Sequence, residues 1–195
     1  MIGWDFSYYW HHRFEHEVRI LWACHVNHHS SRYYNLSTAL RQPWTPIAVV
    51  FFYPVWALFG VAPWMIMVSG GLNLVYQYWV HTEAIERMPS WFEAVFNTPS
   101  HHRVHHGSNA EYLDKNYGGI LIVWDRFFRS FEPEREPVMY GLTKNIETYS
   151  LVAIAFHEYA AIARDLRRAR GLRDRLGILF RGPAWHAPSL ERPQN

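Results

Sequence analysis

A long segment without charged residues, from Ile47 to Val80, is the main feature of the hydrophobic pattern. Gly60 and Pro63 divide it into halves of about 15 and 18 residues, each slightly shorter than the roughly 20 residues that cross a bilayer without thinning it. The pattern predicts a membrane-embedded helical hairpin over residues 46–80. A buried hairpin in a soluble bundle is the alternative, because apolar runs of about 10 to 14 residues also suit core helices.

The rest of the pattern also favours helices, so we expect an all-α fold. Residues 148–166 have helical character and lead into a run of arginines, which predicts a cytoplasmic surface that faces lipid headgroups; a solvated basic helix fits this run equally well. Residues 107–147 are expected to form a polar surface segment that contains the turn "NYGG". The proline-containing tail from Gly182 is expected to be irregular.

Composition indicates one domain over residues 1–195 and an apolar partner. Hydrophobic residues make up 49% of the chain, and the net charge of +2 is too small to suggest a nucleic-acid partner. The single cysteine, Cys24, excludes an internal disulfide and any multi-cysteine zinc site. The first residues lack a basic start followed by an apolar run, so no cleavable signal peptide is expected.

Histidine is the anomalous residue type, with 13 copies. Two copies of the spacing HxxHH, one HxxxH pair and one histidine at the end of the apolar segment give nine candidate metal ligands: His12, His16, His25, His28, His29, His81, His102, His105 and His106. Spacings of three and four place side chains on one face of a helix, so we expect each group to point its imidazoles at one ion. Because the hairpin would cross the membrane twice, all the histidine groups would lie on the same side of the membrane.

The spacings also predict local structure. In one straight helix over residues 4–30, the first two histidine groups would lie on nearly opposite faces and about 20 Å apart along the axis. We therefore predict a break near "VRILWAC", between Glu17 and His25. The stretch "NTPSHHRVHHGSN" predicts a helix of barely two turns, with Thr98 as N-cap and Gly107 after its end. So short a helix needs something to stabilise it, and metal ligation would do so.

The number of histidines favours two ions, because one zinc is saturated by about four ligands. Imidazole suits iron, copper, nickel and zinc alike, so the ligand type leaves the metal open. A histidine-rich storage surface is the alternative to an ordered site. Other candidates are expected to orient the ligands or to line a substrate channel: Glu17, Asn73, Gln77, Glu83, His101, Asp114 and Asp125, with the aromatic residues Tyr8, Tyr9, Trp10, Tyr76, Tyr78 and Trp79.

The ordered motifs "HRFEHE", "HVNHHSSRYYNLSTALRQ", "HTE" and "NTPSHHRVHHGSN" resemble the fatty acid hydroxylase and sterol desaturase superfamily of membrane di-iron enzymes. The continuation "DKNYGGILIVWDRFFRSFEPE" is most similar to the branch that contains alkylglycerol monooxygenase. The resemblance extends from about Asp5 to Gly182, and the family's ligands fall on the nine histidines. Members normally have further transmembrane helices before the first motif, whereas here only eleven residues precede His12. Arg32 stands where the family favours an acidic residue.

This resemblance implies an integral membrane oxidoreductase of the bacterial inner membrane or the endoplasmic reticulum, with its site on the cytosolic side. It would bind two iron ions, use O2, and hydroxylate or desaturate a lipid, whether a fatty acyl chain, a sterol or an ether lipid. The chain has no nicotinamide or flavin motif, so electrons are expected from a separate reductase, a carrier or a reduced pterin. The competing hypotheses are a zinc-dependent hydrolase and a truncated, noncatalytic metal-binding membrane protein.

Overall fold

The computed structural model describes residues 1–45 and 48–191, and within them the regular structure is helical. The helices are α1 (Ile2–Glu17), α2 (Arg19–His29), α3 (Leu36–Ala39), α4 (Val49–Phe52), α5 (Val55–Leu58), α6 (Pro63–Val80), α7 (Ser90–Val95), α8 (Pro99–His105), α9 (Val123–Phe127), α10 (Leu151–Arg168), α11 (Leu172–Phe180) and α12 (Pro188–Glu191). These ranges contain no β-strand, only isolated bridges such as Phe96 with Leu121. The all-α expectation is confirmed.

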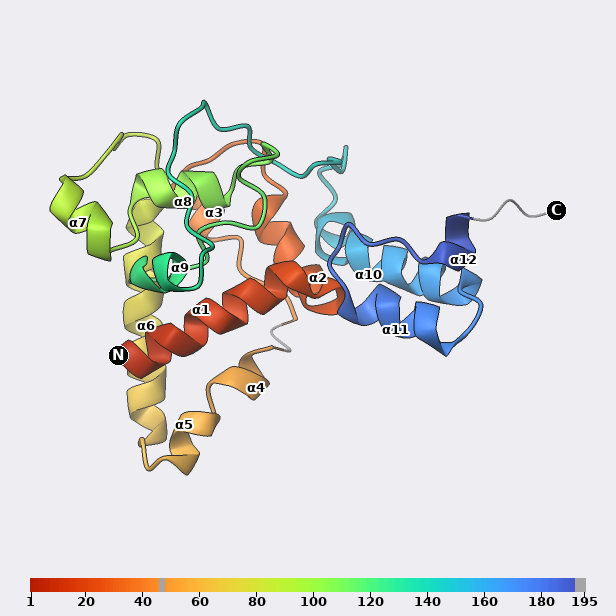
Figure 1. The fold of residues 1–195 in the computed structure, drawn as a ribbon, viewed down its shortest axis with the longest axis horizontal. Coiled ribbons are helices and arrows are strands. Elements are labelled where there is room, and N and C mark those ends of the chain that lie inside the picture. The colour runs from red at the N-terminus through yellow and green to blue at the C-terminus, as the bar shows by residue number, and fades with distance from the viewer. Residues whose placement is uncertain (46–47, 192–195) are drawn as a thin grey trace.

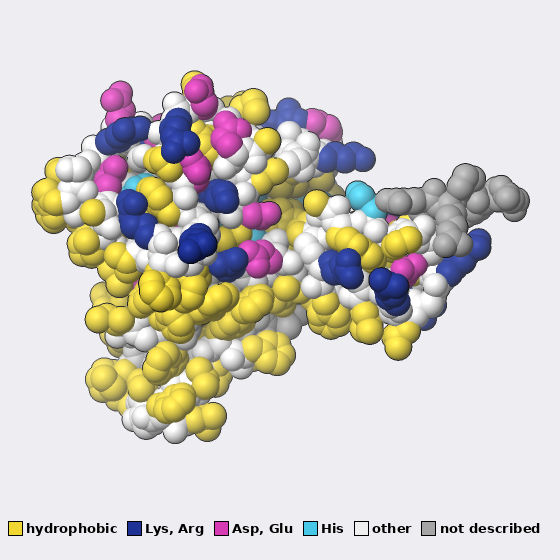
Figure 2. Space-filling view, viewed as in Figure 1, with side chains coloured by type: hydrophobic (Ala, Val, Ile, Leu, Met, Phe, Trp, Pro, Cys, Tyr) yellow, Lys and Arg dark blue, Asp and Glu magenta, His cyan; other side chains and the backbone are white. Residues whose placement is uncertain are grey.

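Three groups of helices are arranged around α1 and α2 (Figure 1). Helices α7, α8 and α9 lie above α1, α10 and α11 pack beside α2, and α12 packs on α10. The first half of α6, together with α4 and α5, projects downward as an arm, which we call the apolar arm. Figure 2 shows that hydrophobic side chains dominate this arm, whereas most charged side chains lie on the rest of the molecule.

The predicted break between the first two histidine groups is confirmed. Helix α1 ends at Glu17, and Val18 has an extended backbone with φ −125° and ψ 114° before α2 begins at Arg19. The N–H of Arg19 bonds to the carbonyl of Arg181, and its guanidinium bonds to Glu158 and Asp165 of α10. The turn is therefore fixed by the C-terminal helices, which also pack on α2 through Ala23 and Ile162.

The predicted hairpin differs from the structure in its first half. Instead of one continuous helix, the chain forms the four-residue helices α4 and α5, separated at Tyr53 and Pro54. Proline has no N–H to donate, and its ring clashes with the carbonyl four residues earlier, so a helix cannot continue through this position undisturbed. The second half is continuous as α6. The start of the predicted hairpin, at residues 46 and 47, lies outside the described residues.

Among the described residues, no helix combines the length and the apolarity needed to cross a bilayer. Two other predictions need refinement. The tail contains the short helix α12, with Pro188 at its first position, so it is not wholly irregular. Residues 107–147 lack long helices, but they are more than a surface segment, because Tyr112, Asn116 and Tyr117 are fully buried over the histidines.

Candidate metal centre

The nine candidate ligands converge into two buried groups. The five-histidine group contains His12, His16, His25, His29 and His105. The four-histidine group contains His28, His81, His102 and His106. Within each group, one ring nitrogen from every residue lies within 4.8 Å of all the others, and every member is buried. The sequence predicted these nine histidines as ligands from their spacing, and the fold brings all nine together.

Each HxxHH motif is divided between the two groups, which corrects the expectation that one motif serves one ion. In α2, His25 and His29 join the five-histidine group and His28 joins the other; in α8, His102 and His106 join the four-histidine group and His105 joins the other. In HxxHH, the first and last histidines are four residues apart, so their side chains differ by about 40° in direction around the helix. The middle histidine directly precedes the last one and differs from it by about 100°. The first and last histidines therefore pair, and the middle one diverges.

The helices that present these histidines end where the sequence predicts. Thr98 caps α8, with its hydroxyl accepting from the N–H of His101 at 3.5 Å, and Pro99 is its first residue. The helix ends at His105, two residues before Gly107. Helix α6 delivers His81 as its C-cap, and the ring Nδ1 lies 2.6 Å from the carbonyl oxygen of Gln77.

Backbone carbonyls fix the tautomers of three histidines. Nδ1 of His12 lies 2.8 Å from the carbonyl of Tyr117, and Nδ1 of His105 lies 3.0 Å from that of Lys115. His81 makes the equivalent contact with Gln77. A carbonyl can only accept, so Nδ1 must hold the proton and Nε2 must present a lone pair. These three Nε2 atoms all point into their groups.

The spacing of the converging nitrogens fits metal ions. The Nε2–Nε2 distance is 3.1 Å for His12 and His25, 3.1 Å for His25 and His29, and 3.0 Å for His81 and His102. Two imidazoles bound at about 2.1 Å and at right angles would lie about 3.0 Å apart. Protons shared between rings could satisfy only some of these atoms, and within the described residues the buried Nε2 atoms of His16, His105 and His106 have no hydrogen-bond partner.

Burial keeps these imidazoles neutral. Loss of solvation lowers the pKa of all nine, to about 3 for His12, and in every one except His81 the neighbouring histidines lower the pKa further. Neutral imidazole is the form that ligates a metal. The two groups are therefore ready to bind cations at neutral pH.

The region that contains these histidines matches a known protein family. The fatty acid hydroxylase family model matches residues 1–130, which include all nine histidines. The chain belongs to the fatty acid hydroxylase family. It is 47% identical to the alkylglycerol monooxygenase of Homo sapiens and 46% identical to that of Danio rerio, over 94% of this chain and 41% of each relative. An ornithine lipid hydroxylase of Rhizobium tropici is 25% identical, over 77% of this chain and 46% of that protein.

The resemblance to alkylglycerol monooxygenases is thus confirmed, and the chain spans about two fifths of the length of these relatives. No solved structure matches it. Helices α10, α11 and α12 lie beyond the part that the fatty acid hydroxylase model matches.

Within the matched residues 1–130, Glu15 contacts the histidines although no sequence motif predicted it. Its carboxylate is 3% exposed, and its two oxygens lie 3.3 Å from Nε2 of His11 and 3.3 Å from Nδ1 of His25. His11 in turn contacts the hydroxyl of Tyr53, 3.0 Å from its Nδ1. A carboxylate beside the second nitrogen of a ligand orients the ring and raises its basicity. The sequence signal that could have identified Glu15 is its position, four residues after His11 and directly before His16.

Of the four acidic residues predicted to orient the histidines, Asp114 lies beside one histidine, whereas Glu17 and Glu83 bond to other residues. Glu17 bonds to Arg13 at 2.8 Å, Glu83 accepts from Tyr140, and exposed Asp114 lies 3.9 Å from Nδ1 of His16. Asp125 is fully buried and accepts the N–H groups of Tyr117 and Gly118, at 2.7 Å each. It therefore contacts no ligand, but it holds the backbone whose carbonyl fixes the tautomer of His12. Asp5, also missed, holds Ile120 and Leu121 in the same loop.

A small cavity of ≈ 90 Å³ reaches both histidine groups. Its lining includes His25 of one group and His28 and His81 of the other, and Glu15, Tyr8, Gln77 and Tyr78 also line it. The Tyr8 hydroxyl donates to Gln77 at 2.9 Å. Asn73 is buried beneath this region, and its amide has no partner among the described residues. The predicted channel residues Tyr9, Trp10, Tyr76 and Trp79 pack elsewhere, Tyr9 against Ser130 and Tyr76 against Asn97.

Replacing Glu15 with glutamine is expected to weaken metal binding by the five-histidine group about 10- to 100-fold, because the neutral amide supports the basicity of His25 less well. Metal affinity measured by competition with a chelator tests this. Glu111→Gln, at an exposed position of the loop after α8, should leave the affinity unchanged. Equal affinities for all three proteins would contradict the role of Glu15.

Proposed function

We propose that this chain is the metal-binding domain of an O2-dependent di-iron lipid monooxygenase. The observation that supports it best is the pair of buried groups of neutral imidazoles, five and four in number, whose nitrogens converge at the separation of metal ligands. Two bound irons would supply O2 activation and the removal of hydrogen from an unactivated C–H bond, which no side chain can achieve. Membership of the fatty acid hydroxylase family favours a lipid as the substrate.

Hydroxylation is the proposed reaction and an alkylglycerol ether lipid the proposed substrate. Relatives that are 44–47% identical to this chain over the aligned region are named alkylglycerol monooxygenases, and the more distant bacterial relative is named an ornithine lipid hydroxylase. The residues of the chain have clear tasks in such a reaction. The backbone carbonyls hold the ligand tautomers, Glu15 orients His25, and the lining of the small cavity would direct one C–H bond toward both groups. Electrons would come from a separate reductase, a carrier or a reduced pterin.

The apolar arm is proposed to dip into a membrane, where the lipid enters. Its exposed side chains are large and hydrophobic: Val50, Phe51, Leu58, Phe59, Trp64 and Met67 are each between 63% and 86% exposed. Such a contiguous apolar surface marks a membrane or protein contact (Figure 2). Helix α11 has a second apolar stripe, formed by exposed Leu172, Leu176 and Phe180. Arg173 and Arg175 lie on either side of this stripe around the helix. This combination is typical of helices at an anionic lipid surface, and it favours a cytosolic orientation of the site.

Metal analysis of the protein purified in mild detergent from membranes tests the proposal. We expect about two irons per chain, since nine nitrogens exceed the capacity of a single ion. Iron, zinc, copper and nickel should be counted together. About one zinc per chain would instead support a hydrolase, and little of any metal would support a noncatalytic protein; either result would contradict the di-iron proposal.

A further inference from the structure

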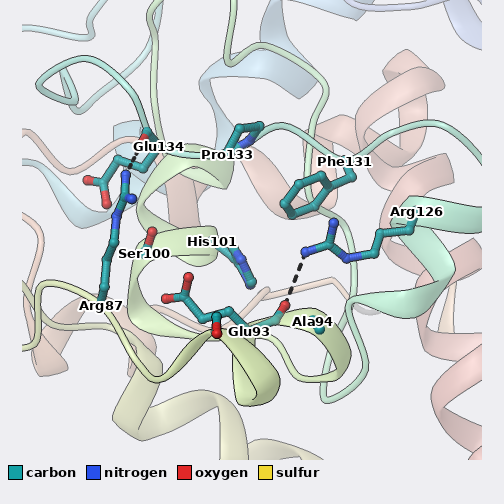
Figure 3. Close-up of a pocket in the computed structure, with 10 residues that line it drawn as sticks. Arg87, Glu93, Ala94, Ser100, His101, Arg126, Phe131, Pro133 and Glu134 are labelled. Atoms are coloured by element: carbon teal, nitrogen blue, oxygen red, sulfur yellow. Dashed lines mark hydrogen bonds between the residues drawn. The ribbon is translucent and has the colours of Figure 1, made fainter.

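His101 belongs to the cluster "HHRVHH", yet it joins neither histidine group. Its side chain is almost fully buried, at 2% exposure, and its Nδ1 has no hydrogen-bond partner among the described residues. The ring lines a second cavity of ≈ 420 Å³, between α7, α8 and the loop at residues 131–134 (Figure 3). The cavity is large enough for a small metabolite.

The carboxylates at this cavity are already engaged. Both oxygens of Glu134 accept from the buried guanidinium of Arg103, at 2.8 and 2.6 Å. Oε1 of Glu93 accepts from the N–H of Met88 at 3.0 Å and from the hydroxyl of Thr98 at 3.3 Å. Neither carboxylate contacts the two arginines at the rim.

Neither of those two arginines is paired with a carboxylate among the described residues. Arg87 donates to the backbone carbonyl of Glu134 at 2.6 Å, and Arg126 donates to that of Glu93 at 3.1 Å. In the part of the chain that the structure describes, neither forms a salt bridge with a carboxylate. The guanidinium of Arg126 also lies 3.7 Å above the ring of Phe131, which holds it in place (Figure 3). Two oriented cations therefore face each other across the cavity.

We propose that this cavity binds the phosphate or carboxylate group of a small soluble molecule. Guanidinium groups are the preferred partners of such oxyanions, and the hydroxyls of Ser90 and Ser100 line the same space as further donors. Helices α7 and α8 lie at the end of the molecule away from the apolar arm, which favours a soluble ligand over a membrane lipid (Figure 1). The site is separate from the metal centre, although α8 contributes residues to both. It stands independently of the proposed function.

Isothermal titration calorimetry tests the proposal. The iron-loaded protein is titrated with inorganic phosphate or acetate at constant ionic strength. Arg87→Gln and Arg126→Gln should each weaken binding about tenfold or more, because each removes a charge-assisted hydrogen bond. Arg135→Gln is the matched control, since Arg135 is exposed in the neighbouring loop and pairs with Glu132. Iron content measured on every variant shows whether the fold is intact, so a negative result here would leave the metal proposal untouched.

A variant that binds the anion more tightly would show that the arginine variants lose binding through the site and not through unfolding. Glu93→Gln should tighten binding, because it removes a negative charge from the cavity while the amide oxygen can still accept from Met88. Absence of binding by both probes, or equal binding by the wild type and both arginine variants, would overturn the proposal. Arginine-dependent binding to phosphatidylcholine vesicles that contain phosphatidic acid, without binding of the free anions, would overturn the soluble source of the ligand.

Discussion

Alanine at either of two adjacent histidines, His105 or His106, is expected to abolish lipid oxidation, yet each variant should lose a different metal ion. His105 belongs to the five-histidine group and His106 to the four-histidine group. Removal of one ligand from a buried site deletes one bond to the metal ion, so the ion in that group binds much more weakly. The second group retains its ligands. Each variant should therefore keep about one iron per chain, while a reaction that needs both irons stops.

Cobalt substitution distinguishes which group is lost. The visible absorption of Co(II) depends on the number of ligands, so the ion in the intact five-histidine group of His106→Ala should differ from that in the intact four-histidine group of His105→Ala. His157→Ala, on α10, is the control and should retain both ions and full activity, since His157 belongs to neither group. Identical spectra for the two variants would show that the HxxHH motif serves a single ion. Retained oxidation in both would contradict the di-iron proposal.

Local signals in the sequence were sufficient for the parts of the fold next to the histidines. The break at Val18 follows from the directions of side chains on an ideal helix, and the short helix α8 follows from Thr98 and Pro99. Both predictions rest on backbone geometry within a few residues, where capping and periodicity act. Helix α10 was predicted from its hydrophobic pattern for the same reason.

Partners that are distant in the chain were not predictable in this way. The division of each HxxHH motif depends on where α1 and α6 lie relative to α2 and α8, which no local pattern encodes. Glu15 was missed because its importance comes from packing against His25 across the α1–α2 turn. The split of the hairpin at Pro54 was available in the sequence, but the absence of charge across residues 47–80 concealed it.

The second large effect is expected from acid. Burial lowers the pKa of the nine ligand histidines, to about 3 in His12, whereas in the unfolded chain they titrate near 6.5. Above that pH both states are neutral at these positions, and stability is at its full value. Below it, the unfolded chain binds protons that the folded chain excludes, so stability falls with pH, by up to about 1.4 kcal/mol per pH unit for each histidine.

Because all nine histidines contribute, the loss of stability between pH 6.5 and 5 is large for a domain whose whole stability is typically about 5–15 kcal/mol. We therefore expect the protein to release its metal and unfold near pH 5, since protons also compete with metal for the same nitrogens. Denaturant unfolding of the iron-loaded and the chelator-treated protein, at intervals between pH 7.5 and 5, measures the slope. His12→Asn should reduce the slope of the chelator-treated protein by about one proton. A stability that stays constant to pH 5 would show that these imidazoles are not held neutral by the fold, and the metal-ready state inferred from their burial would be wrong.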